Sequence, residues 1–284
     1  MASGRRFDLA SPATATALGV LALALLTAAL VLGGVSHRFF YSDVVTGIAV
    51  TTFFGGLGVL IARRQPHNPV GWLLLGFDLL LGLSVIAGSY AALCYRLGHP
   101  GLPLAPVALL LVTMWVPAFA LLLVILLFPG GGLVWQRWRW VLWAYAGLTG
   151  CLWIGAAAAP VAAIASGDIH VNSGGVVTGV HDLPRWLAHP SGWLAAAILI
   201  PLAAIVLSFV AHQVLSWRRA TGDHRQQLKW LAFGAAVAIV LGLVGGSLTS
   251  GILSDVFSFG LFALPVSIGV GILKYRLYDI DLLG

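Results

Sequence analysis

Eight long apolar runs, separated by short polar gaps, constrain the fold more than any other feature of the sequence. They cover approximately residues 13–35, 44–62, 70–93, 105–128, 140–164, 193–215, 230–252 and 255–273. A helix needs about 20 apolar residues to cross roughly 30 Å of hydrocarbon, and backbone polar groups in lipid must pair within the segment. The pattern predicts an all-α integral membrane protein. We expect residues 1–284 to form a single polytopic bundle of about eight transmembrane helices, without a soluble catalytic domain.

The distribution of Lys and Arg predicts how these helices are oriented. If the N-terminus is cytoplasmic, twelve basic residues fall in inner segments and three, Arg38, Arg96 and Arg185, in outer segments. Cytoplasmic loops of membrane proteins carry an excess of Lys and Arg. An even number of helices then places both termini in the cytoplasm. The sequence therefore predicts a multi-pass protein of the cell membrane.

Composition identifies the lipid bilayer as the main partner and argues against nucleic acid. Hydrophobic residues make up 60% of the chain and charged residues 8%, whereas soluble domains carry about 25% charged residues. The net charge is +6, but the basic residues lie in the gaps between apolar runs and form no single stripe. This spacing is typical of topology determinants and not of a phosphate-binding surface.

Motifs of known catalytic chemistry are missing from the sequence, so we do not expect an enzyme. There is no HExxH, no GxSxG and no kinase glycine loop, and FPGGGLVW lacks the GK[ST] of a phosphate loop. The longest inner loop has about 14 residues, too few for a globular catalytic domain. Cys94 and Cys151 lack metal-ligand spacing and are expected to be free thiols. We predict no cofactor and no metal site.

Asp78 is the one carboxylate well inside an apolar run. It lies about nine residues, or roughly 13 Å, along the helix from Pro69. A carboxylate within the membrane is costly and is a functional hypothesis by default, and low dielectric favours its neutral form. Asp78 could relay protons or bind a cationic ligand. The structural alternative is a neutral acid that is hydrogen-bonded to a facing Ser, Thr or Trp.

The third outer loop, about Ser166 to Gly192, is either a flexible connector or a lid that contacts a ligand. It carries His170, His181 and His189. These side chains are candidates for sensing, because histidine titrates near physiological pH. Solvated loop histidines are the plainer interpretation, and no pair has the spacing of a zinc site.

Small and aromatic residues inside the runs suggest how the helices pack. Gly55, Gly56 and Gly58 cluster in the second run, and Gly242 and Gly246 form a GxxxG in the seventh. Small residues let helices approach closely in lipid, so we expect intramolecular packing, with a homodimer as the alternative. A further set is expected to be structural: Trp115, Trp143 and Trp153 as packing residues, and His212 near an inner helix end.

Four inner stretches resemble a known family. They are ARRQPHNPVGWLLL (Ala62–Leu75), LLFPGGGLVWQRWRW (Leu126–Trp140), HRQQLKWLA (His224–Ala232) and LPVSIGVGILKYRLYDID (Leu264–Asp281). Together they look like the N-terminal membrane region of multi-pass sensor histidine kinases from high-GC Gram-positive bacteria. The resemblance covers nearly the whole chain, and its most specific part is the closing YRLYDID.

The resemblance implies a two-component input module that detects a signal in the membrane and passes it through the last helix to the cytoplasm. Arg276, Tyr278, Asp279 and Asp281 match the family's junction motif and would lie where the signal leaves the bilayer; the alternative is an ordinary interfacial anchor.

The chain departs from the family in two places. Gly130 and Gly132 replace the acid and base of the family's FPDGRL turn, and the phosphoacceptor helix and ATP site that follow in relatives are missing from these residues.

Two functions follow from these patterns. The first is a non-catalytic sensor or signal-input module whose kinase activity, if any, comes from a missing C-terminal domain or from a cytoplasmic kinase or other signalling partner. The second is a small transporter or permease that uses Asp78. Prolines inside several runs could kink helices, as in transporters, but prolines are tolerated in membrane helices.

Overall fold

The chain is mostly helical in the computed structural model, which describes residues 10–36, 42–99, 101–113, 123–128, 138–178, 192–247 and 263–281. The elements are α1 (Pro12–Val35), α2 (Ser42–Arg64), α3 (Pro69–Ala91) with the π-helical turn η1 (Ala92–Arg96), α4 (Ala105–Val112), α6 (Arg139–Ser166), β1 (His170–Val171), β2 (Val177–Thr178), α8 (Gly192–Arg219), α9 (Gly222–Ser247) and α11 (Ala263–Asp281). Each predicted apolar run overlaps a described helix. Within the fourth run, the described residues form α4 and a short helical stretch at residues 123–127.

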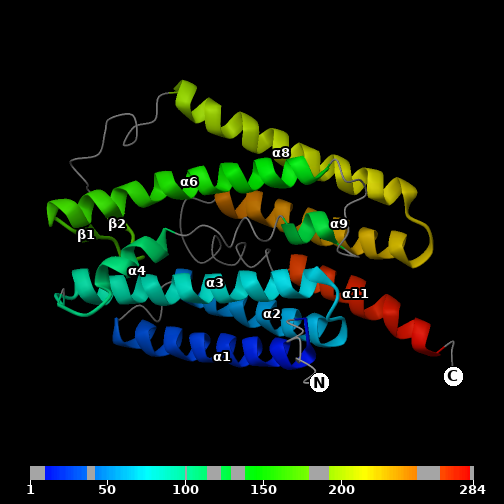
Figure 1. Ribbon diagram of the computed structural model, residues 1–284, viewed down its shortest axis with the longest axis horizontal. Helices are drawn as coiled ribbons and strands as arrows, with labels where there is room; N and C mark the ends of the chain where they lie inside the picture. Colours follow the sequence, from blue (N-terminus) through cyan, green and yellow to red (C-terminus); the bar gives the residue numbers. More distant parts are fainter. Residues whose placement is uncertain are drawn as a thin grey trace, which may run out of the picture.

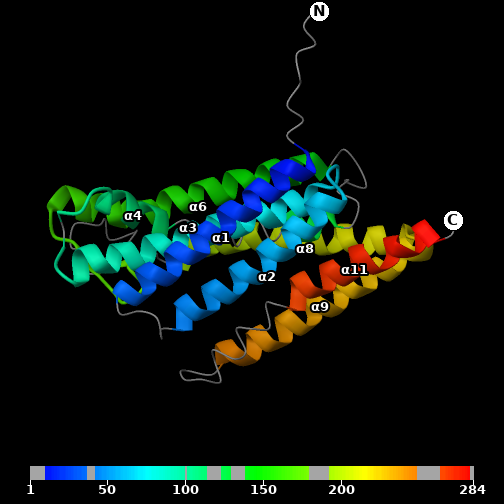
Figure 2. The ribbon, with the colours of Figure 1, turned by 90° about the horizontal axis from the view of Figure 1, so that it is seen from below.

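The helices run side by side along the long axis and alternate in direction (Figures 1 and 2). One end is named the basic end, because Arg63 and Arg64 end α2, Arg139 begins α6, and Arg218 and Arg219 end α8 there. The opposite end carries β1 and β2 and is named the hairpin end. The start of α1 and the end of α11 both lie at the basic end (Figure 1).

Four of the described helices are long and apolar enough to cross a membrane: Pro12–Val35, Pro69–Arg96, Arg139–Ser166 and Ile200–Arg219. Their outward faces expose large apolar side chains, among them Val20, Ile154 and Leu207. Soluble monomers rarely expose contiguous apolar faces of this kind. The bundle is therefore compatible with lipid as its solvent.

Helices α2 and α3 approach each other closely through glycine. A Cβ at Gly58 would lie 2.9 Å from the backbone nitrogen of Leu75, and one at Gly71 would lie 2.7 Å from that of Ala62. At the basic end the turn into α3 is fixed by the Asn68 side chain, which accepts a hydrogen bond from the Val70 N–H at 3.0 Å. Intramolecular packing of the second run's glycines, as predicted, is confirmed at Gly58.

Helix α11 packs against α9 and α2 and shares a core with α3. Leu264, Ile268 and Ile272 of α11 are buried in a cluster that includes Phe54 of α2 and Leu74 of α3. Across α9, a Cβ at Gly234 would collide with the side chain of Ser267. α11 continues as one helix to Asp281, beyond the predicted end at residue 273, and extends past the ends of α1, α2 and α3 (Figures 1 and 2).

A small antiparallel hairpin at the hairpin end corrects the prediction of a purely helical chain. His170 pairs with Thr178 and Val171 with Val177. Asn172 stabilises the turn, because its Oδ1 accepts hydrogen bonds from the N–H groups of Gly174 and Val176. The turn packs on α3, where the left-handed Gly175 lies against the backbone of Gly88.

Three smaller predictions can be compared with the structure. Cys94 and Cys151 are free thiols, as predicted. Trp143 is 68% exposed, so the prediction that it packs inside the bundle is wrong. An all-apolar helix has no polar face to show which side turns outward, and Trp143 lies on the outward side. Trp115 lies outside the described residues.

Candidate functional site

Asp78 lies in the middle of α3 and is buried, with 2% of its surface exposed. Its carboxyl group faces Gly55 of α2, where a Cβ would collide with Oδ2. Glycine at position 55 therefore makes the space that the carboxyl occupies. The predicted interior carboxylate is confirmed as a buried group, and its neighbour across the helix interface is a glycine.

A cavity of about 380 Å³ adjoins this carboxyl between α1 and α2. Thr51, Thr52, Gly55 and Gly56 of α2 line one side, and α1 supplies an apolar wall that includes Leu23. Leu23 is 63% exposed, so the cavity reaches the outer surface of the bundle. Its volume falls within the range of about 300–1,000 Å³ typical of small-molecule sites.

The cavity presents one acid in otherwise apolar or weakly polar surroundings. Oδ1 of Asp78 has no hydrogen-bond partner among the residues that the structure describes, and the described lining holds no Lys or Arg. Thr16, on the α1 side, donates its hydroxyl hydrogen to Pro12 O at 2.8 Å. A buried polar group without a partner is costly. This arrangement suits a ligand that brings a hydrogen-bond donor or a positive charge.

The structural alternative predicted for Asp78 required a hydrogen bond from a facing Ser, Thr or Trp. Among the described residues Oδ1 has no such partner, and the residue that the carboxyl meets on α2 is Gly55.

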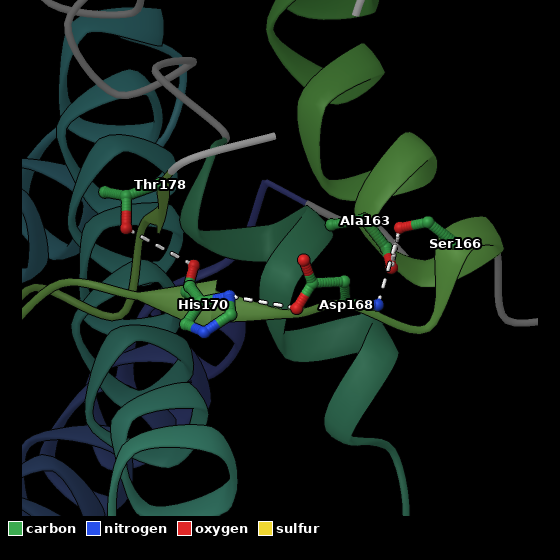
Figure 3. Close-up of polar contacts among 5 residues, drawn as sticks. All are labelled: Ala163, Ser166, Asp168, His170 and Thr178. Atoms are coloured by element: carbon green, nitrogen blue, oxygen red, sulfur yellow. Dashed lines mark hydrogen bonds and ion pairs between the residues drawn. The ribbon is translucent and has the colours of Figure 1, made fainter. Parts of the chain in front are cut away.

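His170 is the one predicted sensing histidine within the described residues; His181 and His189 lie outside them. His170 Nδ1 lies 3.1 Å from Asp168 Oδ1, and the two side chains are 71% and 58% exposed (Figure 3). Thr178 Oγ1 donates to His170 O at 3.5 Å across the hairpin. Contacts between exposed polar side chains contribute little to stability. The geometry therefore fits the plainer interpretation, in which His170 is a solvated residue at the start of the hairpin. The described residues gather no metal-binding cluster.

His212, predicted to be structural, is buried in α8. Its ring lies edge-on to Trp138 at 4.9 Å between centroids. This packing confirms the prediction.

The predicted junction residues Arg276, Tyr278, Asp279 and Asp281 all lie on α11, at the basic end. Their side chains lie outside the described part of the structure. The turn glycines Gly130 and Gly132 also lie outside the described residues, as do the surroundings of Gly242 and Gly246.

One feature that sequence reasoning missed is that α2 connects the cavity to α11. Thr51 and Gly55 face the cavity, whereas Phe54 packs in the core with its ring 4.5 Å from that of Phe77. One turn further on, Leu57 contacts α11, since a Cβ at Gly269 would lie 2.6 Å from its Cδ1. The glycine content of α2 was visible in the sequence, but not which helix each glycine meets.

Comparison with protein-family models, curated proteins and solved structures gives no match for this chain.

Proposed function

We propose that the chain is a non-catalytic membrane sensor, an input module that passes a signal through α11 to the cytoplasm. In this proposal eight helices cross the cell membrane, both termini are cytoplasmic and residues 1–284 form one domain. The twelve-to-three distribution of Lys and Arg supports this orientation. Kinase activity belongs to a partner or to a domain outside these residues.

The observation that carries the proposal is the position of α2 between the Asp78 cavity and α11. Gly55 faces the carboxyl on one side of α2, and Leu57 meets Gly269 of α11 on another. Phe54 and Phe77, the neighbours of Gly55 and Asp78 in sequence, stack in the core that α11 shares. A change in the cavity therefore has a contiguous packed route to the helix that leaves the bundle at the basic end.

Packing of this kind favours discrete rearrangement over gradual deformation. Close-packed helices switch between discrete arrangements and do not deform continuously. A small shift at one site can therefore move a whole helix at another. A ligand in the cavity changes the position of α11 only if it binds one arrangement better than the other. Coupling requires that the cavity and α11 bias the same two-state element, and kinase output measures this.

The test is a chimera in which the whole chain precedes the dimerisation helix and ATP-binding domain of a sensor histidine kinase. Zero to four alanines are inserted after Asp281, and autophosphorylation is measured in membranes. An input module sets the rotation of α11, so kinase output should vary with a period of about 3.6 residues. Output that is independent of the insertion length would contradict the proposal.

A matched pair of substitutions on α11 tests whether its packing against α2 sets the kinase output, or whether α11 only attaches the kinase to the membrane. Gly269→Leu collides with Leu57 and should shift the insertion length that gives maximal output. Val266→Leu is the control, because Val266 is 49% exposed on the same helix. Equal profiles for both variants would show that the packing of α11 against α2 does not set the output.

The orientation can be tested with single cysteines in a background that lacks Cys94 and Cys151. Val176→Cys at the hairpin end should react with a membrane-impermeant maleimide in intact cells. Thr221→Cys, in the connection between α8 and α9, should react only after permeabilisation. The reverse labelling would place the termini outside the cell.

A second candidate is a small transporter or permease, favoured by the unpartnered Oδ1 of Asp78 beside a cavity that reaches the bundle surface. It is tested with the purified chain in vesicles that enclose a pH-sensitive dye. Proton entry that Asp78→Asn abolishes, without loss of folded protein, would favour transport. Equal traces for the unaltered chain and for empty vesicles, or for the unaltered chain and Asp78→Asn, would exclude proton transport through Asp78.

A further inference from the structure

A second cavity, of about 550 Å³, lies between α8 and α9 towards the basic end. Phe209, Gln213 and Trp217 line it from α8, and Leu228, Lys229 and Ala232 from α9. Phe209, Gln213 and Trp217 are spaced four residues apart on α8, and Leu228 and Lys229 lie four and three residues before Ala232 on α9, so each set lies on one face of its helix. The two helices are joined by only Ala220 and Thr221 and diverge from there (Figures 1 and 2). This space is named the α8–α9 groove.

The walls of the α8–α9 groove are apolar apart from Gln213 and Lys229. The Nε2 of Gln213 is occupied by the protein itself, because it donates hydrogen bonds to the carbonyls of Ile125 and Leu126, whereas its Oε1 is buried and has no hydrogen-bond partner among the described residues. These carbonyls end the helical stretch at residues 123–127 and have no partner within it. Gln213 thereby holds the helical stretch at residues 123–127 against α8. The rest of the groove surface is apolar and suits a hydrocarbon chain.

Positive charge gathers at the basic end of the groove. Lys229 lines it, and Arg225 lies one helical turn earlier on α9, with its guanidinium carbon 4.9 Å from the centre of the Trp217 ring. Arg218 and Arg219 end α8 beside it. Tryptophan and basic side chains of this kind mark the headgroup level of a bilayer, where clustered Lys and Arg attract anionic lipids.

We propose that the α8–α9 groove binds one acyl chain of an anionic phospholipid, with the lipid phosphate held by Lys229 and Arg225. The apolar walls fit a hydrocarbon chain, and charge complementarity at the basic rim selects the headgroup. A zwitterionic lipid such as phosphatidylcholine would fill the groove equally well and also carries a phosphate, but its quaternary ammonium competes with Lys229 and Arg225 for that phosphate, so the two cations favour the lipid with a net negative charge. The site is separate from the Asp78 cavity and does not depend on the sensing proposal.

The test is native mass spectrometry of the full-length protein in detergent containing equal amounts of palmitoyl-oleoyl phosphatidylglycerol and phosphatidylcholine. The wild type should retain phosphatidylglycerol preferentially. Each cation near an anionic lipid surface contributes about 1 kcal/mol, so Lys229→Gln and Arg225→Gln should each lower the preference about five-fold. Arg63→Gln is the control, since Arg63 lies at the same end, on α2.

A substitution in the groove separates the site from general attraction to the surface. Ala232→Trp fills the groove and should displace bound lipid whatever its headgroup, with the thermal unfolding midpoint checked to confirm folding. Equal retention of the two lipids by the wild type would overturn the proposal, and so would an unchanged preference in Lys229→Gln. A dimer that Ala232→Trp converts to a monomer, with lipid retention unaffected, would assign the groove to a second copy and also overturn it.

Discussion

The Asp78 cavity and the α8–α9 groove place their polar groups in opposite ways. In the cavity, a buried acid lies deep between close-packed helices, and glycine at position 55 makes room for it. In the groove, the walls are apolar and the charge stands at the rim, on Lys229. Under the two proposals, a ligand of the cavity brings a hydrogen-bond donor or a positive charge, and a ligand of the groove brings an apolar chain with an anionic headgroup.

The two regions also differ in how tightly their helices pack. Helices α2 and α3 approach at Gly58 and Gly71, where even one added methyl group would meet backbone. Helices α8 and α9 diverge, and Val210 and Val214 on the groove face of α8 are 54% and 43% exposed. Close packing transmits displacement, so the cavity is the region suited to signalling. The groove is suited to anchoring the bundle in its lipid.

The largest effect is expected for Gly71→Leu, which forces a side chain into the backbone of Ala62. Overpacking typically costs about 1–3 kcal/mol and more when backbone must move, so most of the protein should fail to purify as a monodisperse species. Gly76→Leu on the same helix is the control, because a Cβ there meets nothing within 4 Å. Size-exclusion chromatography in detergent measures the folded fraction; equal recovery of the two variants would disprove close packing of α2 on α3.

A smaller effect is expected for Gly55→Ala, whose methyl group collides with the carboxyl of Asp78. The new methyl group meets the end of a side chain and not backbone. We therefore expect the free energy of unfolding to fall by about 1 kcal/mol, at the low end of overpacking costs. The neighbouring Gly56→Ala meets open space and should be neutral or stabilising, because alanine favours helix. The thermal unfolding midpoint of each purified variant measures the difference.

A double-mutant cycle sharpens this prediction. In an Asp78→Ala background the carboxyl is gone, so Gly55→Ala should no longer destabilise the protein, and the coupling energy should account for most of its single-mutant effect. An undiminished penalty in that background would mean that Gly55 does not face Asp78.

The smallest effect is expected in the groove, for Ala232→Leu. The new side chain enters open space between α8 and α9, so the free energy of unfolding should change by no more than about 0.5 kcal/mol, as at ordinary surface positions. Chemical denaturation of the purified protein measures it. A penalty comparable to that of Gly71→Leu would show that α8 and α9 pack as tightly as α2 and α3.

The sequence predicted helices at every apolar run and singled out Asp78, because length, hydropathy and one interior charge are local properties. It did not predict the pairing of Asp78 with Gly55 or the exposure of Trp143. Helices that are apolar on all sides have no polar face to show which side meets protein and which meets lipid. The hairpin at His170–Thr178 was also missed, since its strands are two residues long and depend on packing against α3.

The most direct test of the account is the autophosphorylation of the kinase chimera with Asp78→Asn, compared at each insertion length with the unaltered chain. Asparagine keeps the size of the side chain but removes its acid. If the cavity is coupled through α2 to α11, the variant should change the output or the insertion length at which output peaks. Identical profiles for the two chains, with equal amounts of folded protein in the membrane, would contradict the claim that this cavity drives α11.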